Sequence, residues 1–302
     1  MTQLERGDPA PLFAGVTTAG EDWWLSTAAG DRVVLTFVDG TVAVGWPEAE
    51  HTVLDDENQI AERYGLAGEH RVVVLDERLR VLAVLGSDDQ TSLRDLLHAP
   101  ADEVPPPILV VPRVFEPDFC ARLVAEYERV GGTDSGFVRS DEHGRTVGVV
   151  DHAHKRRDDL VITDPELRAG MKRRIERRLV PEIRRAFQFT ATRVERYLVA
   201  CYDSASGGHF GPHRDNTTKG TAHRKFAVTI NLNTGYIGGD LRFPEFGWAL
   251  HRAPLGGAVV FSCSLLHEAT RVIEGRRYCT VPFLYDEDGE ALRRENRAYV
   301  TP

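Results

Sequence analysis

The pattern that most constrains the fold of this chain is formed by His213 and Asp215, two positions apart, and by a distant His267. On an extended strand, side chains alternate between faces, so residues two apart point the same way. His213 and Asp215 can therefore approach one ion together. A third ligand must come from another strand. His267 follows Asp215 by 52 positions, which leaves room for several strands, so the pattern predicts a sheet architecture in which distant strands meet.

The residue types in this pattern also restrict the chemistry. Two imidazoles and one carboxylate on one face of an octahedron leave three positions open, and non-haem Fe(II) oxygenases have this arrangement. A structural zinc site would fill its fourth position with Cys or His. Either His alone is more often an ordinary surface or core histidine. With Arg277 ten residues after His267, however, the set predicts an iron site beside an anchor for an acidic cosubstrate, because a guanidinium fork matches a carboxylate.

Residues 107–286 resemble the Fe(II)/2-oxoglutarate-dependent dioxygenases of the prolyl 4-hydroxylase-like branch. The features that match the family pattern, in chain order, are Tyr202, Gly207-Gly208, His213-x-Asp215, Gly238-Gly239, His267 and Arg277. The resemblance implies that His213, Asp215 and His267 are the catalytic metal ligands. It also implies that Arg277, rather than Arg276, pairs with the far carboxylate of 2-oxoglutarate, with Tyr202 beside it. The implied cofactors are Fe(II), 2-oxoglutarate and O2, with ascorbate as a candidate reductant.

The resemblance further implies an activity. We expect a dioxygenase that hydroxylates an unactivated C–H bond of an amino acid, a peptidyl residue or a small metabolite, with release of succinate and CO2. The alternatives are a non-catalytic iron or 2-oxoglutarate sensor or scaffold, and a cupin-like metalloenzyme that does not use 2-oxoglutarate. The complete ligand set argues against a decayed enzyme, and Arg277 discriminates against the cupin-like alternative. A prolyl substrate is not implied, because fold and site chemistry transfer better than pocket detail.

Residues 194–285 are expected to form successive strands separated by Gly-rich turns, which indicates a double-stranded β-helix, the cupin-like jelly roll, with the metal in its mouth. The expected strands span residues 194–202, 224–233, 239–243, 248–253, 257–262 and 277–285. Thr229 and Asn231 alternate on one face of the second of these strands. If that face lines the barrel, either residue can hydrogen-bond 2-oxoglutarate; a half-exposed strand is the alternative.

Helices are expected at residues 117–130 and 164–187, where they would back the larger sheet of a mixed α+β domain. Between them, residues 139–159 are rich in loop-forming residues, and we expect this segment to contact substrate, because loops on rigid scaffolds commonly carry recognition. The candidate substrate contacts are His154, Arg156 and Arg157 in this segment, with the two arginines available for an acidic group, and His209 and Asn216 near the ligands.

Residues 1–103 are expected to form a separate α/β domain, with strands at 33–38, 71–75 and 79–85 and helices at 58–64 and 92–97. Its opening, Gly7-Asp8-Pro9-Ala10-Pro11, and the strand 33–37 resemble the peroxiredoxin branch of the thioredoxin fold. That chemistry needs a thiolate, and residues 1–119 contain no cysteine. The domain is therefore expected to be a scaffold, a dimerisation surface or a substrate-side wall.

The bulk properties set the remaining limits. The chain has 302 residues, enough for two domains, and a Pro-rich linker over residues 98–107 places the expected boundary near 103, between domains 1–103 and 104–302. The net charge of −9 disfavours nucleic-acid binding. The opening residues have no apolar core and the sequence has no long apolar run, so neither a signal peptide nor membrane contact is expected. The four scattered cysteines fit the cytoplasm. A homodimer is an open possibility.

Overall fold

A computed structural model describes residues 4–38, 40–46, 49–100, 104–141 and 143–300. The chain divides into two compact units, residues 1–105 with 243–249 and residues 106–242 with 250–302. The expected boundary at residue 103 lies outside the described residues. Within the described residues, no helix is long and apolar enough to cross a membrane.

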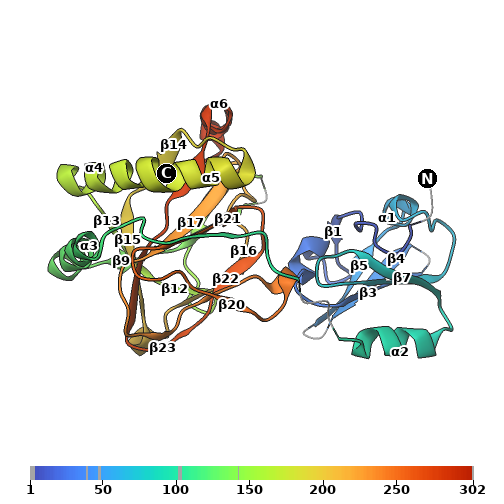
Figure 1. Cartoon of the computed structure of the whole chain (residues 1–302). Helices are drawn as coiled ribbons and strands as arrows, with labels where there is room; N and C mark the ends of the chain where they lie inside the picture. The colour runs from blue at the N-terminus through green and yellow to red at the C-terminus, as the bar shows by residue number, and fades with distance from the viewer. Residues whose placement is uncertain (1–3, 39, 47–48, 101–103, 142, 301–302) are drawn as a thin grey trace. The chain divides into compact units, whose positions relative to one another are not determined.

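The N-terminal unit is built on a five-stranded sheet with the order β5-β4-β3-β6-β7, in which every pairing is antiparallel. Its elements are the strands β1 Ala14–Val16, β2 Asp22–Trp24, β3 Val33–Val38, β4 Thr41–Trp46, β5 Ala49–Leu54, β6 Arg71–Leu75 and β7 Val81–Gly86, and the helices η1 Leu25–Ala28, α1 Gln59–Arg63 and α2 Gln90–His98 (Figure 1). Along β3, Val33, Leu35 and Phe37 point into the core, as the period of two requires.

The predicted alternation of strands and helices in this unit is only partly right. The strands 33–38 and 71–75 and both helices occur where expected, but β3 leads through a tight turn into β4 rather than into a helix. The turn contains Gly40 with φ +68°, and Asp39-Gly40 is a dipeptide that favours hairpins. The segment after β3 is therefore a strand.

The second unit is mixed α/β and mostly sheet, as predicted. Its nine-stranded sheet consists of β8 Leu109–Val111, β9 Thr133–Asp134, β13 Asp158–Val161, β14 Arg193–Glu195, β15 Leu198–Asp203, β17 Phe226–Asn231, β21 Ala258–Ser262, β24 Arg276–Thr280 and β25 Phe283–Tyr285. Its five-stranded sheet consists of β12 Lys155–Arg156, β16 His209–His213, β19 Leu241–Arg242, β20 Leu250–His251 and β22 His267–Ala269. The remaining elements are β10 Phe137–Ser140, β11 Thr146–Val149, β18 Ile237–Gly238, β23 Val272–Glu274, η3 Ser204–Ser206, η4 Pro244–Phe246 (grouped with the N-terminal unit), α6 Glu287–Glu295 and η5 Asn296–Tyr299.

The nine-stranded sheet has a core on each face. On β15, Val199 and Cys201 belong to the core that includes the helices, whereas Ala200 and Tyr202 belong to a second core shared with the five-stranded sheet. This alternation follows from the two faces of a strand. The two sheets enclose one cavity, which is lined by residues of both.

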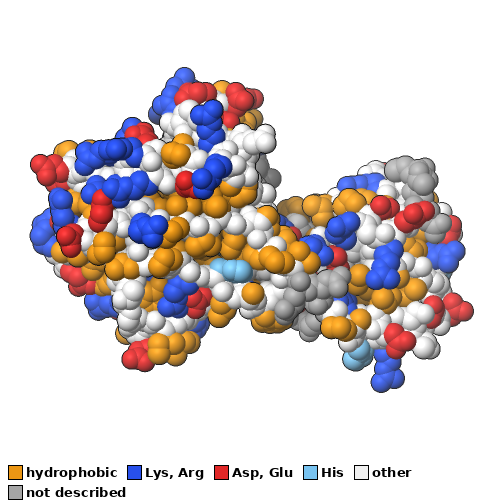
Figure 2. Space-filling view, viewed as in Figure 1, with side chains coloured by type: hydrophobic (Ala, Val, Ile, Leu, Met, Phe, Trp, Pro, Cys, Tyr) orange, Lys and Arg blue, Asp and Glu red, His pale blue; other side chains and the backbone are white. Residues whose placement is uncertain are grey.

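Three helical segments, α3 Pro117–Val130, α4 Pro165–Arg174 and α5 Val180–Phe187, pack against the nine-stranded sheet (Figure 1). The helix expected over 164–187 is interrupted by a π-helical turn, η2 Ile175–Leu179, in which the Val180 N–H donates to the Ile175 carbonyl. Pro181 follows directly and cannot donate a backbone hydrogen bond, so the wider turn relieves the proline inside an otherwise continuous rod. Basic side chains cover the outer face of this rod (Figure 2).

The segment 139–159 is not simply a loop. It contains most of the β10–β11 hairpin, the short strand β12 on the five-stranded sheet and the start of β13 on the nine-stranded sheet. The chain therefore crosses from one sheet to the other between Arg156 and Asp158. Because of this crossing, the side chains of Lys155 and Arg157 are buried at the cavity.

Candidate metal centre

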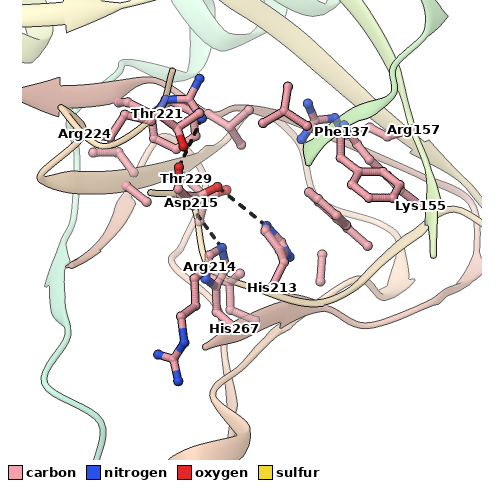
Figure 3. Close-up of a pocket in the computed structure, with 18 of the residues that line it drawn as sticks. Phe137, Lys155, Arg157, His213, Arg214, Asp215, Thr221, Arg224, Thr229 and His267 are labelled. Carbon is pink, nitrogen blue, oxygen red and sulfur yellow. Dashed lines mark hydrogen bonds and ion pairs between the residues drawn. The ribbon is translucent and has the colours of Figure 1, made fainter. Parts of the chain in front are cut away.

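The structure brings His213, Asp215 and His267 together at one end of two neighbouring strands. His213 ends β16 and lies directly across from His267, the first residue of β22. Asp215 follows β16, and its backbone N–H donates to the Cys263 carbonyl at 2.9 Å, which turns the chain toward β22. One ligand atom from each of the three side chains lies within 4.8 Å of the others (Figure 3). This donor set can hold a metal ion.

Both imidazoles are oriented in the same way. The His213 Nδ1 contacts the Gly211 carbonyl at 2.8 Å, and the His267 Nδ1 contacts the Leu265 carbonyl at 3.0 Å. Each Nδ1 is therefore the donor, which leaves Nε2 with its lone pair. The Nε2 atoms lie 3.6 Å and 3.3 Å from the Asp215 carboxylate. Metal-binding histidines are commonly oriented by such a second hydrogen bond.

The electrostatics of His213 and Asp215 agree with this arrangement. Burial and the nearby His267 hold the pKa of His213 well below its usual range, although Asp215 acts in the opposite direction. Burial disfavours ionisation of Asp215, but His267, His213 and Arg224 still hold the pKa of that carboxyl below its usual range. A neutral imidazole and an ionised carboxylate are the forms that bind a metal.

Arg277 lies in the same cavity and is 3% exposed. One terminal nitrogen donates to Thr229 Oγ1 at 2.9 Å and to Asn231 Oδ1 at 3.3 Å, whereas Nε is buried without a hydrogen-bond partner. No carboxylate of the described residues forms an ion pair with Arg277. A buried guanidinium with neutral partners and a free N–H is suited to an anionic ligand.

The residues expected around Arg277 do gather there. Tyr202 is buried opposite Arg277 on the adjacent strand, with its ring 5.3 Å from the guanidinium carbon. Thr229 lines the cavity, and Asn231 is held by a 2.7 Å bond from its amide nitrogen to the Ala253 carbonyl. The face of β17 that carries these residues is buried, so the alternative of a half-exposed strand is wrong. Arg276, by contrast, is exposed and pairs with Asp203 at 2.7 Å.

The Gly-Gly hairpin has a steric role beside Arg277. Gly239 has φ +68°, and a Cβ at this position would lie 2.9 Å from both Arg277 Cδ and Val272 Cγ2. A larger residue would therefore need a strained backbone and would push on the arginine stem. The second glycine of the hairpin leaves room for the buried arginine.

The proposed substrate contacts fare differently. Arg157 lines the cavity, but His154, Arg156, His209 and Asn216 are not among the residues that do. Arg156 is exposed, and the ring nitrogens of His209 contact the carbonyls of Gly207 and Ala153. His154 packs its ring against Phe137 and Phe210 instead. Since Arg156 points outward, the alternation of a strand turns its two neighbours inward.

Three basic residues at the cavity were not anticipated: Lys155, Arg196 and Arg224. Arg224 forms a bidentate pair with Glu195, at 2.9 Å and 2.7 Å, and its other terminal nitrogen donates to the Asp215 carbonyl at 3.3 Å. His223 Nε2 contacts the same glutamate at 2.9 Å. Arg224 thus supports the loop that carries a candidate ligand. The period of two around Arg156 places Lys155 on the same face as Arg157, which was a candidate, but no local pattern in the sequence indicates Arg196.

Residues 197–285 match the family model described as the 2OG-Fe(II) oxygenase superfamily. This range contains all three candidate ligands and Arg277. The protein is a 2-oxoglutarate-dependent dioxygenase, and its cofactors are Fe(II), 2-oxoglutarate and O2. The largely buried donor set and Arg277, whose Nε has no hydrogen-bond partner, fit these groups.

Solved structures with similar folds include prolyl hydroxylases. One, from Trichoplax adhaerens in complex with a hypoxia inducible factor peptide fragment, is 16% identical, with 61% of this chain and 86% of that chain covered and a TM-score of 0.45. A prolyl-4-hydroxylase from Pseudomonas putida is 17% identical, with 65% and 98% covered and a TM-score of 0.44. Similarity at this level assigns no substrate. No curated protein matches the chain.

Proposed function

We propose that the second unit is a double-stranded β-helix hydroxylase. Its substrate would be an amino acid, a peptidyl residue or a small metabolite with an unactivated C–H bond. In this proposal, His213, Asp215 and His267 hold Fe(II). The bound iron supplies the activation of O2 that converts 2-oxoglutarate to succinate and CO2 and the C–H bond to C–OH.

The observation that carries the proposal is the position of Arg277 in the cavity of the three ligands. The guanidinium has a buried Nε without a partner and no carboxylate among its described neighbours. In the proposal it binds the far carboxylate of 2-oxoglutarate, while Thr229 and Asn231 hold its other nitrogen and fix the direction of the fork. Tyr202 and Phe261 close the cavity around the ligand and reduce the access of water.

The test is succinate release from 2-oxoglutarate by Fe(II)-loaded protein, screened against pooled amino acids, peptides and metabolites. Succinate that rises with one pool, together with a product heavier by one oxygen atom, supports hydroxylation. Tight binding of iron and 2-oxoglutarate without succinate in any pool would favour the sensor instead. In the same assay, Arg277→Ala should lose activity at limiting 2-oxoglutarate. Arg276→Ala is its matched control, because Arg276 is the exposed neighbour of Arg277.

For the N-terminal unit we propose a non-catalytic, thioredoxin-like scaffold. The β6–β7 hairpin beside β3, with α1 preceding it, is compatible with that fold, whereas the β3–β4 hairpin departs from it. The support for lack of chemistry is that residues 1–119 contain no cysteine. Peroxide consumption by the full chain with a thiol reductant should not exceed that of the reductant alone. Consumption above that level contradicts the proposal.

A further inference from the structure

The cavity is lined by more basic side chains than its cosubstrate explains. Its basic lining residues are Lys155, Arg157, Arg196, Arg214, Arg224 and Arg277, and its acidic lining residue is Asp215. In the proposed function, Arg277 binds 2-oxoglutarate. Arg224 is neutralised by Glu195, and Arg214 donates to the Ser264 carbonyl. The remaining group, Lys155, Arg157 and Arg196, is called the cationic wall below.

Lys155 is buried among neutral groups. It is 4% exposed, and its Nζ donates to Ser135 Oγ at 2.9 Å and to the Gly136 carbonyl at 2.6 Å. Nζ also lies 4.8 Å from the centre of the Phe210 ring. No carboxylate of the described residues forms an ion pair with it. Burial of an ammonium without a counter-ion is costly, so Lys155 favours its neutral amine in the folded chain alone, and an anionic ligand beside Nζ would stabilise the charged form.

Arg157 has one carboxylate partner but retains a free donor. Its terminal nitrogen lies 2.6 Å from Asp159, while Nε is buried without a partner. Arg157 and Arg277 both lie near Tyr202, with guanidinium carbons 5.9 Å and 5.3 Å from the centre of that ring. The cavity therefore has two buried guanidinium groups with free Nε atoms, and one cosubstrate carboxylate at Arg277 leaves the other unsatisfied.

Arg196 interrupts the strands that would otherwise run from β14 into β15. Its φ of +55° is unusual for a residue with a side chain. The strained turn places the guanidinium against the Phe283 ring at 4.4 Å, with Nε donating to the Val281 carbonyl at 3.2 Å. Among the described residues, no carboxylate forms an ion pair with Arg196. A strained backbone position that directs a partly buried cation without an ion pair toward a cavity is a candidate ligand-binding feature.

We propose that the substrate carries a carboxylate or phosphate and that the cationic wall of Lys155, Arg157 and Arg196 binds this oxyanion. The inference rests on the proposed function, since it assigns a substrate class to the same cavity. The cavity is also lined by the apolar side chains of Phe137, Val138 and Val281. The proposed substrate therefore has an apolar portion in addition to its anionic group. The two charges of 2-oxoglutarate are met by Arg277 and the metal ion, which leaves the cationic wall for the substrate.

The titration of Lys155 supports the same conclusion. Burial, followed by the nearby Arg157, lowers the pKa of Lys155 to about 6. Burial and the neighbouring arginines lower the pKa of Arg196 to about 10. An oxyanion beside Lys155 would raise its pKa, so anion binding near pH 7.5 should take up a proton. The groups that face Lys155 are Ser135, Gly136, Arg157, Asp159, Arg196, Phe210 and Asp215.

The experiment is calorimetric binding to full-length, anaerobic protein loaded with Fe(II) and saturated with 2-oxoglutarate. The probes are butyrate, butyl phosphate and butyramide, which share an apolar chain and differ in the end group. We expect one anion site per chain, with butyramide at least tenfold weaker. The stronger of the two anions identifies the source of the oxyanion, and a dependence of the enthalpy on buffer identity reports the proton uptake.

Two variants locate the site. Lys155→Met and Arg196→Met keep the apolar stem of each side chain and should weaken the anion at least tenfold, while 2-oxoglutarate affinity changes less than threefold. Lys155→Arg keeps the positive charge and should retain anion binding. This variant still tests the proposal if Lys155→Met does not fold. Lys172→Met, the same change at an exposed lysine of α4, is the matched control and should behave as wild type. Circular dichroism checks the fold of each.

Three results would overturn the inference. Equal binding of butyramide and the anions, or no binding of either anion, shows that the wall does not recognise charge. Anion binding that survives both methionine variants shows that the anion does not depend on Lys155 or Arg196. Loss of 2-oxoglutarate in place of the anion assigns the wall to the cosubstrate. Failure of the wild-type protein to bind Fe(II) and 2-oxoglutarate at all would instead contradict the proposed function.

Discussion

The two units of the chain bury very different polar groups. Among the described residues of the N-terminal unit, Thr17 and Asp55 are the buried polar side chains. The second unit buries Lys155, Arg157, His267 and Arg277, all at one cavity. Both units rest on antiparallel sheets with apolar cores, so the difference does not come from the type of secondary structure. Buried charge is costly in any fold, and its concentration at one place marks the functional site.

Asp55 and Asp215 show the contrast in a single residue type. The Asp55 carboxylate accepts the backbone N–H groups of Ile60 and Ala61, both at 2.9 Å, and so stabilises the start of α1. The Asp215 carboxylate faces the imidazoles of His213 and His267. One carboxylate is satisfied by its own chain, whereas the other is arranged with two further metal-binding groups.

The largest effect is expected from Asp215→Ala. Removal of the only carboxylate of the donor set should release iron and abolish succinate formation, while the fold is retained. Metal analysis and succinate assay measure the two effects, and circular dichroism checks the fold. Normal turnover by an iron-depleted Asp215→Ala protein would remove the basis for the contrast with Asp55.

Arg277→Ala comes next. Loss of a buried charge pair costs about 2–5 kcal/mol, so the 2-oxoglutarate requirement should rise by about 30-fold or more. Iron affinity should change much less, because Arg277 is not in the donor set. Arg276→Ala, at the exposed neighbour, should alter the requirement little. Equal effects of the two variants, measured by titration of 2-oxoglutarate in the succinate assay, would contradict the assignment of Arg277.

Glu195→Gln tests a partly buried carboxylate of the second unit that forms ion pairs within the chain and does not line the cavity. Burial opposes its ionisation, but His223 and Arg224 hold the pKa of Glu195 below its usual range. Because the pKa of Glu195 is lower in the folded chain than in the unfolded chain, the ionised carboxylate stabilises the fold above the unfolded pKa, near 4.5. This stabilisation is lost progressively as the pH falls from 4.5 toward the folded-state pKa. Glu195→Gln should cost about 3 kcal/mol near neutral pH, and less in acid. Urea unfolding from pH 3 to 8 measures this, and a pH-independent difference contradicts it.

The smallest effect is expected from Asp55→Ala. Loss of the two hydrogen bonds to the start of α1 should lower the free energy of unfolding by about 1–2 kcal/mol. Iron content and succinate formation should be unchanged, because Asp55 belongs to the N-terminal unit. Urea unfolding and the succinate assay separate the two readouts. A loss of iron in this variant would show that the two carboxylates are not independent.

The sequence predicted the centre of the site better than its walls. His213, Asp215 and His267 could be grouped because a strand of period two and one distant partner suffice to define the donor set. The offset from His267 distinguished Arg277 from Arg276, and the structure buries the first and exposes the second. These features depend on residue type and spacing, both of which are visible in a sequence.

The walls depend on tertiary geometry. Arg196 faces the cavity because of a left-handed turn between two strands, and no residue type in that turn requires it. Arg156 and Arg157 were both chosen as substrate contacts, but only Arg157 and the overlooked Lys155 are buried. The alternation of a strand places these two on one face, but which face turns inward became clear only when β12 was seen to pair with β16. The hairpin at Gly40 was not predicted. The strand 33–37 resembles the peroxiredoxin branch of the thioredoxin fold, and this resemblance suggested a helix after the strand.

The contacts of His213 and His267 to carbonyls two residues upstream have a practical consequence. Each imidazole is positioned by its own tripeptide, Gly211 to His213 or Leu265 to His267, and neither depends on the ion for its direction. The metal can therefore be exchanged without refolding the chain. Replacement of iron by a redox-inert divalent ion should give a stalled complex with 2-oxoglutarate and substrate bound together, stable in air for long enough to crystallise.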